Sequence, residues 1–257
     1  MRKQIAAVAV AALLVFAGCS AGGNGGATTA PETTAGGAGD PVYESPLDAQ
    51  TVAQTHESVV RDAGTFTLVS TSNRTQGGQS VSVQSSTAVD LATGAYFATQ
   101  ESPMQTVEQF GFGNGTAYQR VSTADNQTRY TIPREAPNTS QLAGSQLESF
   151  VGAFSFSHTG SETVDGTDTH VYEASGVEDL NQSAPGLGSL DTENLTSLTA
   201  ELYITDDGLV KRFGYSLTVS TSNGEASIAT DQRYVDIGST TVSEPAWLDE
   251  ARANTSA

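Results

Sequence analysis

The chain contains one cysteine, Cys19, and a single thiol limits the chemistry available to it. One thiol cannot form an internal disulfide, and it cannot build a metal site from several cysteines. A nucleophilic cysteine needs a positioned base, and no histidine lies near Cys19 in the sequence. Cys19 instead follows an apolar run, residues 5–16, and the small residues Ala17 and Gly18. Its position therefore indicates processing rather than catalysis.

The three histidines are scattered, with His56 expected on a helix and His158 and His170 on strands. The sequence contains no HExxH, no Gly-X-Ser-X-Gly and no paired-cysteine zinc spacing. Asp168 and His170 are two residues apart and would share one face of a strand, so they could be two metal ligands, but no third ligand is evident. We therefore predict no catalytic residue, no metal site and no cofactor; a secreted enzyme of unfamiliar type stays an alternative.

The N-terminus predicts export. Arg2 and Lys3 precede an apolar run shorter than the roughly 20 residues of a membrane-spanning helix, which is the layout of a signal peptide over residues 1–18. The segment "FAGC" resembles the lipobox of bacterial and archaeal lipoproteins, although Phe16 stands where leucine is usual. The resemblance implies cleavage before Cys19, a lipid on its thiol, and anchoring at the extracellular face of the cytoplasmic membrane. The alternative is a signal peptide with an incidental cysteine.

The charge of the processed chain is strongly negative. Removal of residues 1–18 takes away Arg2 and Lys3 and no acidic residue, which leaves 29 acidic and 9 basic residues and a formal charge of −20. Such a surface repels nucleic acid and anionic headgroups, so we expect no nucleic-acid partner. The acidic bias, with Lys211 as the only remaining lysine, resembles proteins of salt-loving archaea. The alternative is an acidic secreted protein of another origin.

Asparagine usage also indicates export. Seven of the nine asparagines stand in Asn-X-Ser/Thr, the acceptor pattern of N-glycosylation on exported surface loops. A chain rich in serine and threonine forms this pattern by chance, but seven of nine is an excess. The candidate acceptors are Asn73, Asn114, Asn126, Asn138, Asn181, Asn194 and Asn254.

Composition divides the processed chain into three parts. Residues 19–45, the lipidated cysteine and a Gly/Thr-rich stretch, have almost no large apolar side chains and predict a disordered tether. Residues 46–252 are long enough for one domain with a sizeable core. Residues 253–257 are expected to form a disordered tail.

Within the domain, two segments have the apolar spacing of amphipathic helices. The first begins at Pro46 and Asp48 and ends at Gly64. The second covers residues 139–154 with a capping threonine or serine, and a weaker segment at about 178–199 is either loop or short helix.

Most of the remaining domain alternates apolar and polar residues with period two, as in "VSVQSSTAVDL" and "LVKRFGYSLTV". Turn signals such as "QGG", "GNG", "DDG" and "SNG" separate these runs and predict about ten strands in an antiparallel meander. A long antiparallel sheet curls, and its apolar concave face must be covered. The predicted fold class is therefore α+β: a single strongly curved antiparallel β-sheet, a half-barrel, with two or three helices packed in the concave face.

The order of elements carries a second resemblance. A helix leads into "GTFTLVSTS", hairpins read "TDTHVYEASG" and "AELYITDDGLVKRFGYSL", and the domain ends in "YVDIGSTTVSEPAWLDEA". Over about residues 46–252 the layout resembles the LolA-like half-barrel superfamily, which includes the mycobacterial LppX and LprG lipoproteins, and a family of haloarchaeal surface lipoproteins with this ending. The resemblance implies a cavity between sheet and helices that holds a lipid or another apolar ligand.

Two functions therefore compete. The chain could be a surface lipoprotein that binds or carries an apolar ligand, or a cell-envelope interaction or transporter-accessory module whose core is filled. Trp247 is expected to close one end of the sheet. The candidate cavity residues, which would instead fill the core in the second case, are Leu147, Phe150, Val151, Phe154, Leu217 and Val219.

The charge of −20 predicts a stability that depends on salt. Crowded carboxylates repel one another, and dilute buffer screens this repulsion weakly, whereas at 1 M salt the Debye length falls to about 3 Å. We expect the melting temperature, measured by circular dichroism, to rise markedly between low and molar sodium chloride. A melting temperature independent of salt would contradict the interpretation as a halophilic protein.

Overall fold

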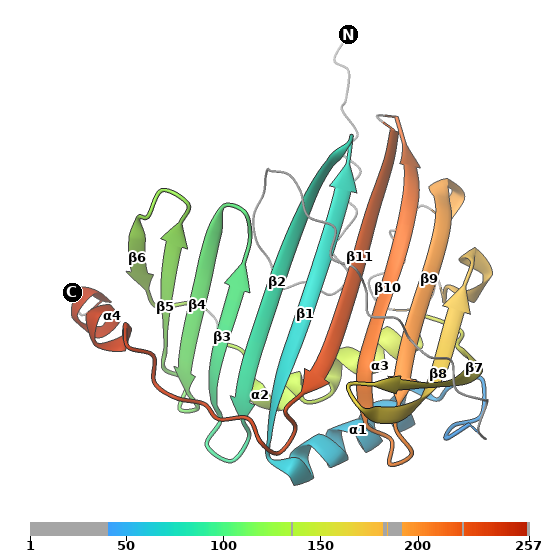
Figure 1. The fold of residues 1–257 in the computed structure, drawn as a ribbon, viewed down its shortest axis with the longest axis horizontal. Coiled ribbons are helices and arrows are strands. Elements are labelled where there is room, and N and C mark those ends of the chain that lie inside the picture. Colours follow the sequence, from blue (N-terminus) through green and yellow to red (C-terminus); the bar gives the residue numbers. More distant parts are fainter. Residues whose placement is uncertain (1–40, 135, 182–183, 185–191, 223, 256–257) are drawn as a thin grey trace.

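The structure, a computed structural model, describes residues 41–134, 136–181, 184, 192–222 and 224–255. Its main feature is one antiparallel sheet of eleven strands in the order β6-β5-β4-β3-β2-β1-β11-β10-β9-β8-β7 (Figure 1). The edge strands β6 (Thr128–Thr131) and β7 (Ser157–Val164) do not pair with each other, so the sheet is open. This arrangement confirms the predicted α+β half-barrel.

In chain order, successive strands are added from the centre of the sheet to one edge, and the later strands then lead from the opposite edge back to the centre. The first half comprises β1 (Thr65–Gln76), β2 (Gln79–Asp90), β3 (Ala95–Glu101), β4 (Gln105–Phe112), β5 (Ala117–Thr123) and then β6. The second half begins at β7 and continues through β8 (Thr167–Ser175), β9 (Leu195–Ile204), β10 (Val210–Thr221) and β11 (Gly224–Val235). Because β11 pairs with β1, the two ends of the meander meet in the middle of the sheet.

Helix α1 (Ala49–Ala63) forms where the sequence predicts it. Asp48 is its N-cap, and the Asp48 side chain accepts a hydrogen bond from the Thr51 backbone N–H at 2.6 Å. Gly64 ends the helix in the left-handed conformation, with φ of 78°, which glycine adopts at little cost. One face of α1 is buried against the sheet, and it consists of Val52, Ala53, His56 and Val60.

The connection from β6 to β7 joins the two edges of the sheet, and it contains α2 (Thr139–Leu142) and α3 (Ser145–Gly152). The predicted single helix over 139–154 is therefore wrong, since the chain breaks at Ala143 and Gly144. Its cap is also neither threonine nor serine: the Asn138 side chain accepts from the Ser140 N–H. The break lies where the connection meets α1, because a Cβ on Gly144 would stand 3.0 Å from the Glu57 Cβ.

The ends of the domain extend beyond the predicted limits. Residues 41–45, assigned to the tether by sequence, belong to the fold: Val42 and Tyr43 pack against the main core. Helix α4 (Leu248–Thr255) includes residues 253–255, so the predicted disordered tail is wrong there. The signal peptide, Cys19 and the rest of the tether lie outside the described residues.

The described part of the segment at 178–199, predicted as loop or short helix, consists mainly of short 3-10 turns and the start of a strand. It contains two short 3-10 turns, η1 (Val177–Asp179) and η2 (Thr192–Asn194), and β9 begins at Leu195. Residues 182–183 and 185–191 lie outside the described part.

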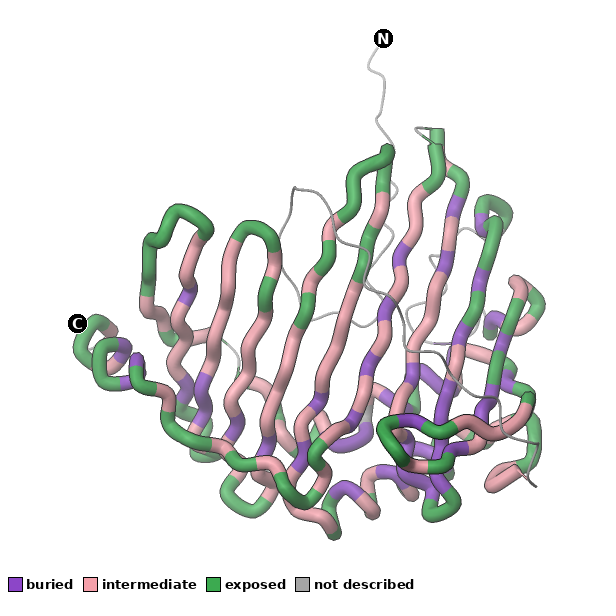
Figure 2. The backbone as a smooth tube through the Cα atoms, viewed as in Figure 1, coloured by how far each residue is buried: buried purple, intermediate pink, exposed green. Residues whose placement is uncertain are grey.

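Helices α1–α3 cover one face of the sheet, which we call the inner face, and α4 lies on the outer face near β5 and β6 (Figure 1). Buried residues concentrate where the strands cross these helices (Figure 2). The main core on the inner face combines the buried side of α1 with Leu147 and Phe150 of α3 and with Tyr172, Leu202 and Phe213 of the sheet.

His56 is a fully buried polar group at the centre of this core. The Val210 backbone N–H donates to its Nδ1 at 3.1 Å, so the ring proton of the neutral imidazole lies on Nε2. The ring also contacts Tyr234 edge-on, with centroids 4.4 Å apart. Burial lowers the pKa of His56 from 6.5 to about 3.

This depressed pKa predicts an acid-sensitive fold. Below pH 6.5 the unfolded chain binds a proton at this position, while the folded chain excludes it until about pH 3. His56 therefore lowers the free energy of unfolding by about 1.4 kcal/mol for each pH unit within that window, and contributes no pH dependence above it. Urea unfolding at pH 7, 6 and 5 in molar salt measures the slope.

The matched control is His56→Gln, whose side-chain carbonyl can still accept from Val210 N–H but does not titrate. Its slope between pH 6 and 5 should be shallower than that of the wild type by about 1 kcal/mol per unit. Equal slopes in the two proteins would show that His56 is not the group responsible.

Candidate functional site

The six apolar candidates lie together on the inner face, but in two clusters. Leu147, Phe150 and Val151 of α3 belong to the main core. Leu217 and Val219 of β10 belong to a second cluster, and Phe154 packs against both clusters. All six candidates therefore share one face of the sheet, and the structure divides them between two clusters.

The α3 residues are packed as core. Leu147, Phe150 and Val151 are at most 2% exposed. The Phe150 ring lies 5.0 Å from that of Phe213 and 5.8 Å from that of Phe156, with tilted geometry at both contacts. These contacts fill the space between α3 and the sheet.

The second cluster is an apolar strip on β9, β10 and β11. Its strand residues are Leu195, Leu198, Leu217, Val219 and Ile228. On the other side of the strip lie Ala153, which directly follows α3, Ala184, and Leu180 of the segment 176–181, which we call the cover segment. Over this strip the described cover is a short segment with one 3-10 turn, η1, rather than an α-helix.

Backbone hydrogen bonds attach the cover segment to the residues after α3. Ser155 N–H donates to the Asp179 carbonyl at 2.7 Å, and Asn181 N–H donates to the Ala153 carbonyl at 2.9 Å. These bonds flank Phe154 and Leu180, which face each other as an isolated antiparallel bridge. The pairing between the two segments is thus one isolated bridge, and the cover segment is also attached to β9, because the Gly176 N–H donates to the Leu198 carbonyl at 3.0 Å.

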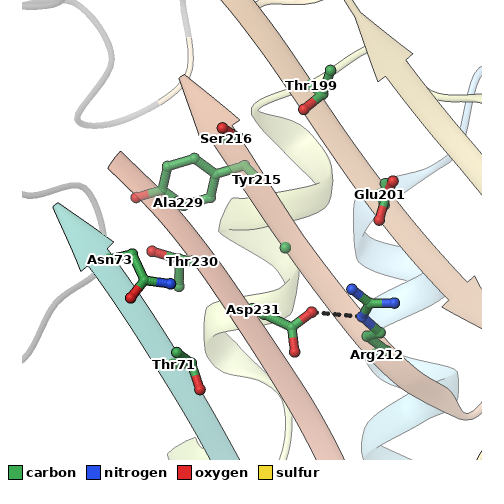
Figure 3. Close-up of a pocket in the computed structure, with 11 residues that line it drawn as sticks. Thr71, Asn73, Thr199, Glu201, Arg212, Tyr215, Ser216, Ala229, Thr230 and Asp231 are labelled. Carbon is green, nitrogen blue, oxygen red and sulfur yellow. Dashed lines mark hydrogen bonds and ion pairs between the residues drawn. The ribbon is translucent and has the colours of Figure 1, made fainter. Parts of the chain in front are cut away.

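The outer face carries a polar pocket that sequence reasoning missed (Figure 3). Its volume is about 230 Å³, and it spans four strands from β1 to β9. Gly214 forms its floor, because a Cβ there would meet the Thr230 carbonyl oxygen at 2.4 Å. The lining is mostly hydroxyl, amide and charged: Thr71, Asn73, Thr199, Glu201, Arg212, Ser216 and Asp231. A glycine in the middle of an alternating strand was the available signal.

Asp231 organises the charges beside this pocket. Its carboxylate accepts from Arg212 Nε at 2.5 Å and from Arg233 Nε at 3.0 Å. All three side chains are about one-third exposed, so each pair is screened and contributes little to stability, on the order of 0–1 kcal/mol. The Arg212 guanidinium also lies over the Tyr203 ring, 5.1 Å from its centroid.

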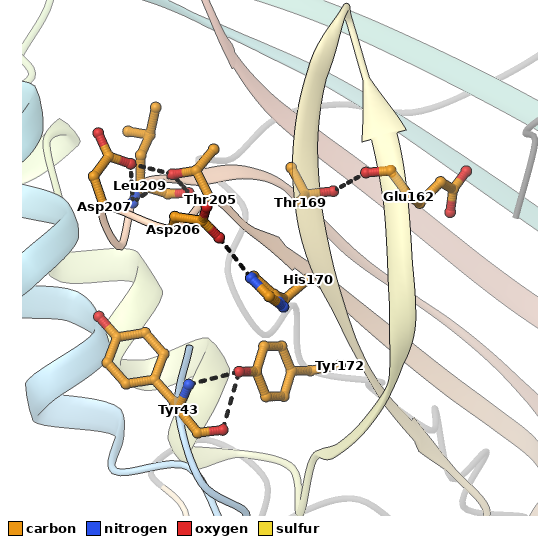
Figure 4. A network of polar contacts seen from close by, with 9 residues as sticks. All are labelled: Tyr43, Glu162, Thr169, His170, Tyr172, Thr205, Asp206, Asp207 and Leu209. Atoms are coloured by element: carbon orange, nitrogen blue, oxygen red, sulfur yellow. Dashed lines mark hydrogen bonds and ion pairs between the residues drawn. The ribbon is translucent and has the colours of Figure 1, made fainter. Parts of the chain in front are cut away.

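A polar network surrounds the β7–β8 hairpin (Figure 4). The Tyr172 hydroxyl donates to the Tyr43 carbonyl at 3.0 Å and accepts from the Tyr43 N–H at 2.8 Å. His170 Nε2 lies 2.7 Å from Asp206 Oδ1 on the β9–β10 turn. The Asp168–His170 pair considered from the sequence does not form a joint site, because Asp168 accepts from Thr163 Oγ1 at 2.9 Å instead.

Trp247 belongs to a third cluster, on the outer face. It is 5% exposed and packs with Phe110, Leu248 and Ala251. The Arg120 guanidinium lies over its ring at 5.8 Å. Trp247 therefore attaches the C-terminal helix to the outer face of β4–β6, and the prediction that it closes an end of the sheet is wrong.

All seven candidate glycosylation asparagines are exposed in the structure. Asn114 and Asn126 lie in turns between strands, and Asn254 lies on α4. The described residues contain no group of three His, Cys, Asp or Glu side chains that could hold a metal ion. None of the described helices combines the length and the apolar character needed to cross a membrane.

Comparison with solved structures returns proteins of the kind that the sequence resembles. LprF from Mycobacterium bovis has a TM-score of 0.40 and 16% identity, over 79% of this chain and 98% of LprF. The lipoprotein LppX from Mycobacterium tuberculosis has a TM-score of 0.37 and 12% identity, over 76% of this chain and 98% of LppX. A putative outer membrane lipoprotein-sorting protein domain from Vibrio parahaemolyticus has a TM-score of 0.29 and 10% identity, over 80% and 99% respectively.

No curated protein matches the sequence. One family model covers almost the whole chain, residues 4–251: the chain belongs to the family of unknown function DUF7537.

Proposed function

We propose that this chain is an exported, lipid-anchored protein whose half-barrel domain binds an apolar molecule, such as a lipid, between the apolar strip of β9–β11 and the cover segment. It acts by binding and carries out no chemical step. The anchor is the lipid on Cys19, and the residues from Cys19 to residue 40 link it to the domain on the extracellular face of the membrane.

The observation that carries the proposal is the difference between the two covers of the inner face. The main core is closed by helices and aromatic rings, whereas the strip of Leu198, Leu217 and Ile228 is closed by the short cover segment. Irregular segments with few backbone bonds open at a lower free-energy cost than packed helices. Opening exposes aliphatic side chains with few polar groups, which is the lining suited to an acyl chain rather than to a charged metabolite.

The surface of the chain supports an extracellular setting. Seven exposed acceptor asparagines are distributed over turns, strands and the C-terminal helix. The strong negative charge of the processed chain disfavours direct contact with anionic headgroups, so a lipid anchor gives membrane attachment that the domain surface does not.

A second candidate is an envelope interaction module with no ligand. The observation that favours it is the low exposure of the second cluster, whose apolar strand residues are at most 8% exposed. In that case the cover segment is a permanent part of the core, and partners would bind the outer surface.

The anchor predicts a change in partitioning when Cys19 is replaced. Cys19→Ser removes the thiol that would carry the lipid, so this variant should be released into the aqueous phase or stay unprocessed. The wild type should partition into the detergent phase of Triton X-114 extracts, because stable anchoring requires more than one buried acyl chain. Equal retention of the two proteins in the detergent phase would contradict the anchor.

The binding site predicts that fixing the cover segment blocks ligand uptake. In the Cys19→Ser chain, Phe154→Cys and Leu180→Cys together place two thiols on the isolated bridge, where residues of an antiparallel pair stand about 4.5–5.5 Å apart at Cα, within disulfide range. Oxidation should weaken binding of a fluorescent fatty acid at least about tenfold, because the cover can no longer open. Fluorescence titration measures the affinity.

Reduction of the same sample is the matched control, since it changes the crosslink and not the sequence. If the reduced and oxidised forms bind equally well, the ligand does not enter beneath the cover segment. If the Cys19→Ser chain with Phe154 and Leu180 intact binds no lipid probe, the interaction module is the correct function.

A further inference from the structure

Two buried imidazole nitrogens, on rings that contact each other, have no hydrogen-bond partner within the described residues. They are Nε2 of His158, on the edge strand β7, and Nδ1 of His170, on β8. The two rings are in contact, with centroids 5.6 Å apart and planes at 45°. A buried polar atom without a partner costs about 1–3 kcal/mol, and such atoms are uncommon in native proteins. A ligand that contacts both nitrogens would satisfy them.

The contact of the other His170 nitrogen, Nε2, indicates which kind of ligand Nδ1 could bind. Its Nε2 lies 2.7 Å from the Asp206 carboxylate, which can only accept when ionised, so Nε2 carries the ring proton. Nδ1 then carries a lone pair, on a ring that contacts the His158 ring. A histidine that donates one ring N–H to a carboxylate and leaves the other nitrogen free is the usual arrangement of a metal-binding histidine. Figure 4 shows His170 directed at Asp206 through one nitrogen, with the second nitrogen on the opposite side of the ring.

We propose that His158 Nε2 and His170 Nδ1 bind one divalent transition-metal ion, such as Zn²⁺ or Cu²⁺. Imidazole is a preferred ligand of these ions. With metal–nitrogen bonds of about 2.1 Å and about 1.1 Å from each nitrogen to its ring centre, a tetrahedral ion holds two imidazole centroids about 5.2 Å apart. The observed 5.6 Å agrees with this geometry before any adjustment. Asp206 orients His170, and water completes the coordination, which the partly exposed side of His158 allows.

The site lies where the tether joins the domain. The His158 N–H donates to Ser45 Oγ at 3.3 Å, and the His158 ring contacts the Tyr172 ring at 5.3 Å. Tyr172 in turn holds the backbone of Tyr43. A bound ion would therefore join β7 to β8 beside residues 43–45, and it would stabilise the folded state because it binds that state and not the unfolded chain.

Isothermal titration calorimetry and thermal melting of the full-length Cys19→Ser chain test the proposal. This background removes a competing thiol, and molar salt suppresses binding to the acidic surface. After chelator treatment, Zn²⁺ and Cu²⁺ should each bind with 1:1 stoichiometry and raise the melting temperature, and Mg²⁺ should do neither.

Variants assign the ligands. His158→Gln should lower the affinity at least about tenfold, and Asp206→Asn should lower it about 10–100-fold without removing a ligand. Asp168→Asn is the matched control, because it lies in the same hairpin and is bonded to Thr163; its affinity should equal that of the starting chain. Copper electron paramagnetic resonance gives a second readout, with hyperfine coupling to two nitrogens before substitution and to one in His158→Gln.

The proposal is overturned if neither Zn²⁺ nor Cu²⁺ binds, if Mg²⁺ gives the same shift in melting temperature, or if His158→Gln binds as tightly as the starting chain. Copper resonance spectra of the starting chain that lack coupling to two nitrogens would also overturn it. This measurement remains informative even if His158→Gln does not fold.

Discussion

An open sheet exposes its apolar inner face to water, and the chain must supply the cover from its own connections. The eleven strands end at β6 and β7, which do not pair, so the inner face cannot close on itself as a barrel does. Strand order then fixes where the cover comes from. The connection from β6 to β7 joins opposite edges of the sheet, and it carries α2 and α3 past α1. The small residue Gly144 at their crossing and the aromatic packing around Phe150 follow from this one constraint.

The cover differs between two parts of the inner face: helices close one part and a short segment closes the other. This difference is the basis of the proposed binding site. Where α1 and α3 lie, rings of Phe150, Phe156 and Phe213 fill the interior. Over β9–β11 the strand side chains are aliphatic and the cover is the short segment held at the bridge between Phe154 and Leu180. Helices keep their backbone bonds within themselves, but an irregular segment depends on bonds to its neighbours and separates more readily.

The three histidines show how the same side chain acquires different roles from its surroundings. His56 accepts a backbone hydrogen bond at the centre of the core, where burial lowers its pKa and keeps it neutral. His170 is held by a carboxylate at the edge of the sheet, and His158 stands beside it with an unpartnered nitrogen. The first is therefore a structural group whose protonation opposes folding. The edge pair is the site that we propose for a metal ion.

The sequence by itself determined the class of fold, the first helix with its limits at Asp48 and Gly64, and the alternation that makes the sheet, because caps and periodicity are local properties. It also placed six apolar residues on the inner face. Their division into a filled core and a strip beneath a short cover depended on tertiary structure, since it follows from which connection crosses which strands. The pairing of His158 with His170, and of His170 with Asp206, joins residues 12 and 36 positions apart through strand register, which no local pattern encodes. Contacts with distant elements likewise decided three element boundaries: the break at Gly144, the order of residues 41–45 and the continuation of the last helix through Thr255. The physical reason is that packing overrides local composition where a segment meets the core.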